Sequence, residues 1–86
     1  MPFSVELSEL ALRQLRILGK AEAERIFAKL ADAAANPNHY FKRLTGREDF
    51  KLRVGDYRVV VRINKVKGCI FVRLIGHRKR VYKDLR

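Results

Sequence analysis

Cysteine, acidic residues and long hydrophobic runs are all scarce in this chain of 86 residues. The single cysteine, Cys69, lies in the apolar run GCIFVRLIG, which argues against a disulfide framework and a thiolate metal cluster. Apolar runs stay well short of the roughly 18 residues of a membrane-spanning helix, and the N-terminus lacks the charged-then-apolar order of a signal peptide. We therefore expect a cytoplasmic protein with no membrane partner, no metal and no cofactor.

The scarcity of acidic residues leaves the chain strongly basic. It has 20 Lys and Arg against 9 Asp and Glu, which gives a net charge of +11 at pH 7. Such a charge attracts polyanions, so nucleic acid, an acidic protein and an anionic membrane surface are the candidate partners. Hydrophobic residues make up 48% of the chain and fall in periodic segments, which predicts one folded domain over residues 1–86.

Hydrophobic periodicity predicts helices in the N-terminal half of the chain. Residues 2–7 alternate as a short strand and lead through Ser8, a good N-cap, into a helix over residues 9–18 that ends at Gly19. A second helix follows at once and ends at Asn36-Pro37, so the two helices should form a hairpin. The helical stripes contain Ala11, Leu15, Leu18, Ala23, Ile26, Phe27, Leu30, Ala31 and Ala34.

From Phe50 onward the hydrophobic period changes from about 3.6 to 2 residues, which is typical of strands. The segments FKLRV, YRVVVRI and CIFVRLI are separated by short polar turns and predict an antiparallel meander. The order β-α-α-β-β-β predicts an α+β fold, with the N-terminal strand and the helical hairpin packed on one face of an antiparallel sheet. The residues expected on that face are Phe50, Leu52, Val54, Tyr57, Val59, Val61, Ile63, Ile70, Val72 and Leu74.

The opposite face of the predicted sheet is basic. Alternation along the strands places there Lys51, Arg53, Arg58, Arg62 and Arg73, and no acidic residue. Like charges on neighbouring strands repel, so this arrangement costs stability unless an anion lies on the face, and a phosphate backbone is the commonest such anion. A solvated polar face is the alternative, although a face selected for solubility alone would mix both signs of charge.

The closing segment GHRKRVY leaves the last strand near this face and adds candidates for chemistry. Arg58 and Arg78 suit the clamping of a phosphate, because guanidinium groups form bidentate contacts and stabilise the extra charge of the transition state. Lys51 is the only amine in the central group and could transfer a proton. Tyr82 could stack on a base or transfer a proton.

His77 is a further candidate, because imidazole titrates near neutral pH and is common in ribonuclease chemistry. His77 is spaced by even numbers of residues from Phe71, Arg73 and Ile75. It should therefore face the same side as they do, the basic face, if the strand continues that far. A structural hydrogen-bonding role is the alternative. The residues expected to contact RNA outside the chemical step are Arg62, Arg73, His77, Lys79 and Arg80.

The segments KRLTG, KLRVGDYRVVVRI and VRLIGHRKRVY occur in this order along the chain. Together with the predicted order of elements they resemble the RelE/ParE superfamily of bacterial and archaeal toxins from toxin–antitoxin pairs. The resemblance implies a small basic toxin that is held inactive by a co-expressed antitoxin, expected to be a small acidic protein. In the RelE branch it implies an endoribonuclease that cuts messenger RNA in the A site of the ribosome, by metal-independent attack of the 2′-hydroxyl group.

Carried over residue by residue, the resemblance implies a catalytic set of Lys51, Arg53, Arg58, Arg78 and Tyr82. Some members of the RelE branch have a second lysine two residues before the equivalent of Lys51, where this chain has Asp49. The ParE branch shares the scaffold but poisons DNA gyrase without cutting RNA, and it is one alternative. A noncatalytic module that binds RNA or the ribosome is another. The arginine and tyrosine of GHRKRVY favour the RelE branch.

Overall fold

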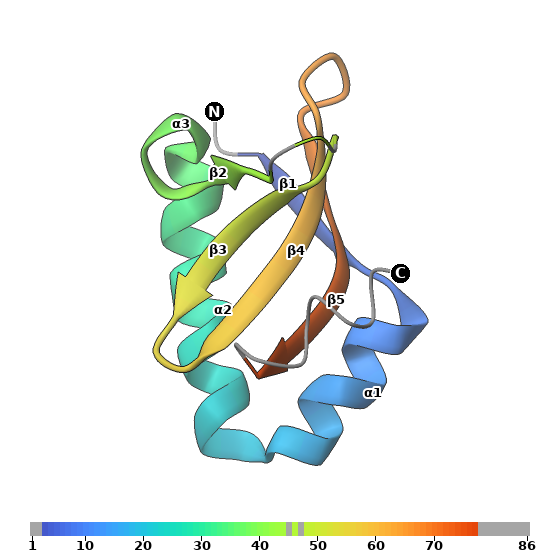
Figure 1. The fold of residues 1–86 in the computed structure, drawn as a ribbon, viewed down its shortest axis with the longest axis vertical. Helices are drawn as coiled ribbons and strands as arrows, with labels where there is room; N and C mark the ends of the chain where they lie inside the picture. The colour runs from blue at the N-terminus through green and yellow to red at the C-terminus, as the bar shows by residue number, and fades with distance from the viewer. Residues whose placement is uncertain (1–2, 45, 47, 78–86) are drawn as a thin grey trace.

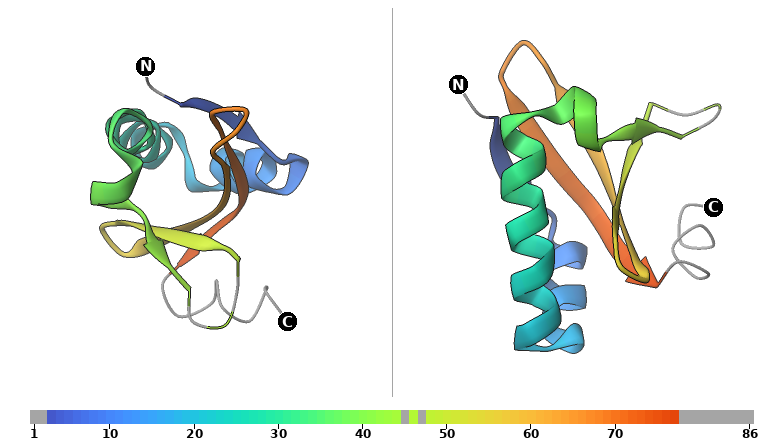
Figure 2. Two further views of the ribbon diagram at one scale, coloured as in Figure 1. Left: turned by 90° about the horizontal axis from the view of Figure 1, so that it is seen from above. Right: turned by 90° about the vertical axis from the view of Figure 1, so that its left-hand side faces the viewer.

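The helices of the protein cover one face of a five-stranded sheet (Figures 1 and 2). The computed structural model describes residues 3–44, 46 and 48–77. The elements are β1 (Ser4–Leu7), α1 (Glu9–Leu18), α2 (Lys20–Ala35), α3 (Pro37–Tyr40), β2 (Lys42–Arg43), β3 (Phe50–Val54), β4 (Tyr57–Asn64) and β5 (Cys69–His77). The strands follow the order β1-β5-β4-β3-β2 across the sheet. The predicted α+β class is confirmed, and the sheet face turned away from α1 and α2 is called the open face below.

The N-terminal strand joins the edge of the sheet instead of packing on its face. β1 lies parallel to β5, with Ser4 opposite Cys69 and Leu7 opposite Val72, so the sheet is mixed. The other strand pairs are antiparallel, as the meander pattern predicted. Parallel neighbours cannot be joined by a tight turn, and here the whole chain between β1 and β5 forms their connection (Figure 1).

The connection from α2 to the sheet contains two short elements that the sequence pattern did not predict. Pro37 is the first residue of α3. The first N–H groups of a helix have no partner within the helix, so the missing N–H of proline costs no hydrogen bond there. β2 pairs with β3 through two residues, Lys42 opposite Lys51 and Arg43 opposite Phe50. Two residues are too few to show an alternating pattern, so this edge strand has no signal in the sequence.

The main core lies between the helical hairpin and the sheet. Most residues of the predicted stripes are buried there, but Phe27 is 46% exposed and Ala31 faces solvent, whereas Ala33 is buried. Gly19 joins the two helices directly with a φ of 91°, a conformation that glycine adopts without strain. The buried members of this core are Ala11, Leu15, Ile26, Leu30, Ala33, Ala34, Phe41, Leu52, Val54, Val59, Val61, Ile70, Val72 and Ile75.

A β-bulge in β5 changes which residues face the helices. Val60 pairs with Leu74 and Val61 pairs with Val72, so Arg73 is an extra residue in the register. The alternation is therefore reversed beyond Arg73. Ile75 joins the main core, and Leu74 packs with Val60 on the open face. The prediction that Leu74 faces the helices is wrong, because strict alternation makes no allowance for the extra residue.

Two side chains of α1 and its cap bind the backbone of β5 beside the bulge. The Ser8 hydroxyl donates a hydrogen bond to the carbonyl oxygen of Arg73 at 2.6 Å, and the N–H of Ile75 donates to Oε1 of Gln14 at 2.6 Å. β1 ends at Leu7, opposite Val72, so its pairing stops just before the bulge. Side chains thus satisfy backbone groups of β5 where strand pairing ends.

Replacing Ser8 with alanine tests this arrangement. Ser8 Oγ also accepts a hydrogen bond from the N–H of Ala11 as the N-cap of α1. We expect Ser8→Ala to lower the free energy of unfolding by about 1–2 kcal/mol, because the helix cap and the bond to Arg73 are lost together. Urea unfolding measures the change. Ser4→Ala is the matched control, since Ser4 makes only a long exposed side-chain bond of 3.3 Å to Gly68 in the described structure, and equal losses in both variants would contradict the role of Ser8.

Candidate nucleic-acid interface

Four cations on three neighbouring strands of the open face form a group that is called the cation cluster below: Lys42, Lys51, Arg53 and Arg58. Lys42 lies opposite Lys51 in the β2–β3 pair, and Arg53 lies opposite Arg58 in the β3–β4 pair. Like charges directly opposite each other destabilise a sheet. An anion among these side chains removes the repulsion, and a phosphate suits both the charge and the guanidinium geometry.

The cation cluster and Tyr40 line a hollow of about 210 Å³. This volume is several times the roughly 30 Å³ that one water molecule occupies in the liquid, so the hollow has room for a phosphate group. Nη1 of Arg58 is buried and has no hydrogen-bond partner among the described residues. A buried N–H group without a partner costs about 1–3 kcal/mol, and a phosphate oxygen that displaced the groups covering this nitrogen would remove that cost.

Tyr40 and Lys42 are not among the predicted site residues. Tyr40 is the last residue of α3, and its ring centroid lies 4.9 Å from Nζ of Lys29 and 4.8 Å from the ring centroid of His39. The contact with Lys29 is a cation–π interaction that ties α3 to α2 and so helps to orient the tyrosine. Neither residue belongs to a segment long enough to show periodicity, so their place beside the other cations could not be read from the sequence.

Arg62 and Arg73 are paired with a buried carboxylate. Asp49 is 1% exposed, and its Oδ1 accepts a hydrogen bond from Nε of Arg62 at 3.2 Å while its Oδ2 accepts one from Nη1 of Arg73 at 2.7 Å. The backbone oxygen of Asp49 also accepts a hydrogen bond from the N–H of Leu44 at 2.9 Å. The expectation that no acidic residue belongs to the basic face is therefore wrong. Asp49 lies in the connection before β3, where alternation predicts no orientation.

His77 lies on the helix side of the sheet. It is opposite Tyr57 in the β4–β5 pair, with the two rings in an edge arrangement at a centroid distance of 6.0 Å. Together with Ile75, and with Gln14 and Leu18 of α1, these residues line a hollow outside the open face. The predicted orientation of His77 toward the basic face is wrong, because the bulge at Arg73 reverses the alternation.

Three residues of the predicted catalytic set, Lys51, Arg53 and Arg58, thus meet at one hollow. The other predicted members of the site, namely Arg78, Lys79, Arg80 and Tyr82, lie outside the described residues. Within the part of the chain that the structure describes, no group of three or more His, Cys, Asp and Glu could hold a metal ion. Among its helices, none is long and apolar enough to cross a membrane.

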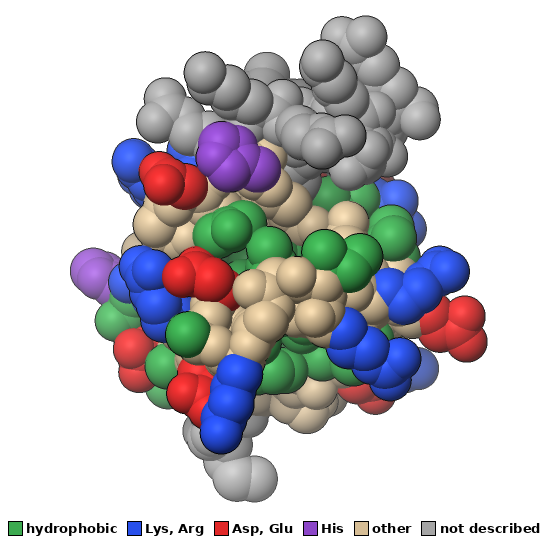
Figure 3. Space-filling model, turned by 90° about the horizontal axis from the view of Figure 1, so that it is seen from below, with side chains coloured by type: hydrophobic (Ala, Val, Ile, Leu, Met, Phe, Trp, Pro, Cys, Tyr) green, Lys and Arg blue, Asp and Glu red, His purple; other side chains and the backbone are tan. Residues whose placement is uncertain are grey.

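Charge is distributed differently at the end of the molecule where α1 meets α2. Seen from this end, basic, acidic and hydrophobic side chains are mixed over the surface (Figure 3). Large apolar side chains are exposed on both helices, with Ile17 at 84% and Phe27 at 46%. The separation of cations from acidic groups in the cation cluster is therefore not general to the surface of this basic protein.

The family described as the ParE toxin of the type II toxin–antitoxin system, parDE, matches residues 5–82, so this chain is a toxin of the type II toxin–antitoxin class. The mRNA interferase toxin RelE of Escherichia coli (strain K12) is 32% identical over 98% of this chain and 94% of its own length. The chain belongs to the RelE/ParE superfamily of toxins.

Solved structures of RelE toxins have the same fold. A mutant of E. coli toxin RelE in the free state superposes with a TM-score of 0.78 and is 26% identical, covering 95% of this chain and 90% of that chain. The toxin in the intact E. coli RelBE toxin–antitoxin complex gives a TM-score of 0.72 at 28% identity, covering 87% of this chain and 95% of that chain. The predicted RelE-like fold is confirmed.

Replacing Asp49 with asparagine tests its role in the open face. We expect the free energy of unfolding to fall by about 2 kcal/mol, because two guanidinium groups lose a buried charged partner. The loss stays below that of a fully buried pair, since the side chains of Arg62 and Arg73 are 57% and 30% exposed and can be hydrated. Chemical unfolding measures the change.

Glu22→Gln is the matched control for this variant. Glu22 forms an exposed helical ion pair with Arg25 at 3.3 Å, and its loss should cost less than about 0.5 kcal/mol. A change no larger in Asp49→Asn than in Glu22→Gln would show that the buried carboxylate does not stabilise the fold.

Proposed function

We propose that this toxin inhibits translation in the cytoplasm by cleaving messenger RNA in the A site of the ribosome. The observation that carries the proposal is the convergence of Lys51, Arg53 and Arg58 on one hollow, together with the buried Nη1 of Arg58, which has no partner in the described part of the chain. The similarity to the mRNA interferase toxin RelE supports an endoribonuclease activity. A strand of phosphates is also the ligand that a repulsive group of cations favours.

The proposed reaction uses the RNA itself as the nucleophile. The 2′-hydroxyl oxygen forms a bond to the adjacent phosphorus while the bond from phosphorus to the 5′ oxygen breaks, which leaves a 2′,3′-cyclic phosphate and a 5′-hydroxyl end. The 2′ proton passes to a base, and the 5′ oxygen receives a proton from an acid. Arg53 and Arg58 would bind the nonbridging oxygens and stabilise the negative charge that develops on them. Lys51 would lie beside the groups that exchange protons.

Arg78 and Tyr82 complete the proposed catalytic set. Arg78 follows His77, the last residue of β5, and would add a further guanidinium group to the reacting phosphate. Tyr82 would stack on a base or take part in proton transfer. Arg62, Arg73, Lys79 and Arg80 would contact the RNA backbone outside the chemical step.

A cognate antitoxin is part of the proposal. One of the E. coli RelE structures that resemble this chain is that of the intact RelBE toxin–antitoxin complex. The net charge of +11 favours a small acidic protein as the partner here, because complementary charge steers association and disfavours other partners.

Purified protein added to programmed ribosomes should yield cut messenger RNA that ends in a cyclic phosphate or a 3′-phosphate. A chelator of transition metals that leaves the Mg²⁺ of the ribosome in place should leave the yield unchanged, because cations of the protein would take the place of a catalytic metal ion. Primer extension locates the cuts, and end-specific ligation identifies the phosphate. Gyrase-dependent DNA breaks in place of RNA cleavage would select a ParE-like function, and arrested translation with intact messenger RNA would select a noncatalytic ribosome-binding module.

Arg58→Ala should slow cleavage by roughly a hundredfold or more, equivalent to about 3 kcal/mol of transition-state stabilisation. Single-turnover cleavage on programmed ribosomes measures the rate, and thermal unfolding shows that the fold is kept. Arg16→Ala is the matched control, because Arg16 lies in the last turn of α1 away from the open face and its removal should leave the rate unchanged. Full activity of Arg58→Ala would place the reacting phosphate elsewhere.

A further inference from the structure

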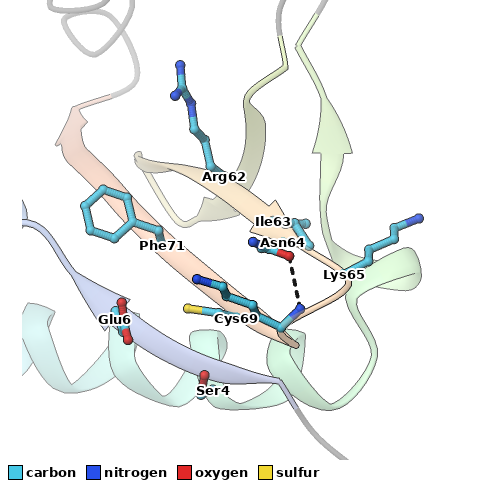
Figure 4. A pocket seen from close by; sticks show the side chains of 9 residues that line it. Ser4, Glu6, Arg62, Ile63, Asn64, Lys65, Cys69 and Phe71 are labelled. Carbon is cyan, nitrogen blue, oxygen red and sulfur yellow. Dashed lines mark hydrogen bonds between the residues drawn. The ribbon is translucent and has the colours of Figure 1, made fainter.

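A second hollow on the open face lies at the end of the sheet away from the cation cluster. It has a volume of about 790 Å³ and is lined by residues of β1, β4, β5 and the turn between β4 and β5 (Figure 4). Phe71 of β5 is one of its lining residues and is 39% exposed. Its chain neighbours Ile70 and Val72 are fully buried in the main core, so alternation turns the Phe71 ring toward the open face.

Charged residues stand on both sides of the exposed ring. Phe71 lies opposite Arg62 in the β4–β5 pair and opposite Glu6 in the β1–β5 pair. Nε of Arg62 donates a hydrogen bond to Oδ1 of Asp49, which orients the guanidinium group, while 57% of the side chain remains exposed. A negative carboxylate beside the ring disfavours a phosphate at that point. The ring itself therefore suits an uncharged flat group, whereas Arg62 suits the phosphate next to it.

The turn after β4 brings two further cations to the rim of the hollow. Lys65 and Lys67 both line it, and the turn is held by a hydrogen bond of 3.0 Å from the N–H of Lys67 to Oδ1 of Asn64 (Figure 4). An exposed aromatic ring on a sheet, bordered by cations, is the arrangement with which proteins stack unpaired bases and follow the backbone of single-stranded RNA.

We propose that Phe71 is a stacking site for an unpaired nucleobase, located a few nucleotides along the RNA from the phosphate in the cation cluster. Arg58 and Arg62 lie on the same face of β4, four residues apart, which corresponds to about 13 Å at roughly 3.3 Å per residue. A single strand covers this distance with a few nucleotides. The buried pair Val60 and Leu74 lies between the two sites, with Leu44 packed against it. The placement of a phosphate in the cation cluster rests on the proposed function.

A fully 2′-O-methylated single strand of 12 nucleotides is a suitable probe, because it lacks the hydroxyl group that would attack the phosphate. Fluorescence anisotropy measures its affinity for the full chain. Phe71→Leu keeps an apolar cover but removes the aromatic face, and we expect binding to weaken about tenfold. The slope of affinity against salt concentration should not change, because no phosphate contact is lost. Phe71→Tyr should restore the affinity.

Two further variants separate stacking from charge and from general apolar contact. Lys67→Gln should reduce the slope of affinity against salt concentration by about one, because it removes a phosphate contact. Ile17→Ala removes an exposed apolar side chain of α1, outside the open face, and should leave binding unchanged. An abasic version of the strand should bind the parent protein and Phe71→Leu equally.

Equal affinities of the parent protein and Phe71→Leu for the base-containing strand, or no binding by the parent, would overturn the proposal. So would a Phe71→Leu protein that binds the cognate antitoxin more weakly but keeps its affinity for RNA, since Phe71 would then be a protein contact. Cleavage on programmed ribosomes shows which RNA supplies the stacked base. If an abasic site in the messenger RNA slows the parent protein as much as Phe71→Leu does, the stacked base belongs to the message. If Phe71→Leu still slows cleavage of the abasic message, the stacked base belongs to ribosomal RNA. Both results support stacking.

This design also separates the stacking site from the proposed cleavage. If Phe71→Leu binds RNA as tightly as the parent protein, and the parent protein cleaves normally, only the stacking site is overturned. Stacking without any cleavage by the parent protein would overturn the proposed activity and leave the second site in place.

Discussion

The β-bulge at Arg73 is the feature on which the arrangement of the open face depends. A single extra residue in β5 turns Leu74 toward the open face and Ile75 toward the helices. It also separates His77 from the cation cluster by placing it beside Tyr57 on the helix side. The bulge is held by the Ser8 hydroxyl on one side and by the Asp49 carboxylate on the other, so α1 and the connection before β3 both act on the same residue.

The two ends of the open face manage positive charge in different ways. Around Asp49, two arginines share a buried carboxylate, and their charge is partly neutralised within the protein. In the cation cluster, like charges lie opposite each other across two strand pairs, and the residues lining the hollow include no acidic side chain within the described chain. The repulsion in the cation cluster therefore lowers the stability of the fold, and this is where a phosphate binding site is proposed.

Much of the fold and part of the site could be predicted from the sequence, because periodicity is a local property. Side-chain spacing predicts the helical stripes, the three long strands and the shared face of Lys51, Arg53 and Arg58. The structure has them in these places, apart from the exposed stripe residues Phe27 and Ala31. The parallel pairing of β1, the two-residue strand β2 and the bulge depend on contacts between distant segments. The carboxylate of Asp49 and the ring of Tyr40 reach the open face from connections, where no period exists. These parts of the fold and of the site can be identified only from the three-dimensional structure.

The position of the scissile phosphate on the ribosome tests the central claim most directly. A structure of this toxin bound to a ribosome whose A-site message carries 2′-O-methyl groups would keep the message intact and show where its phosphate lies. The account predicts that the nonbridging oxygens lie at about 2.7–3.2 Å from the nitrogens of Arg58, with the open face turned toward the message. A message that lies against the helices, or a phosphate outside hydrogen-bonding distance of every residue in the cation cluster, would contradict it.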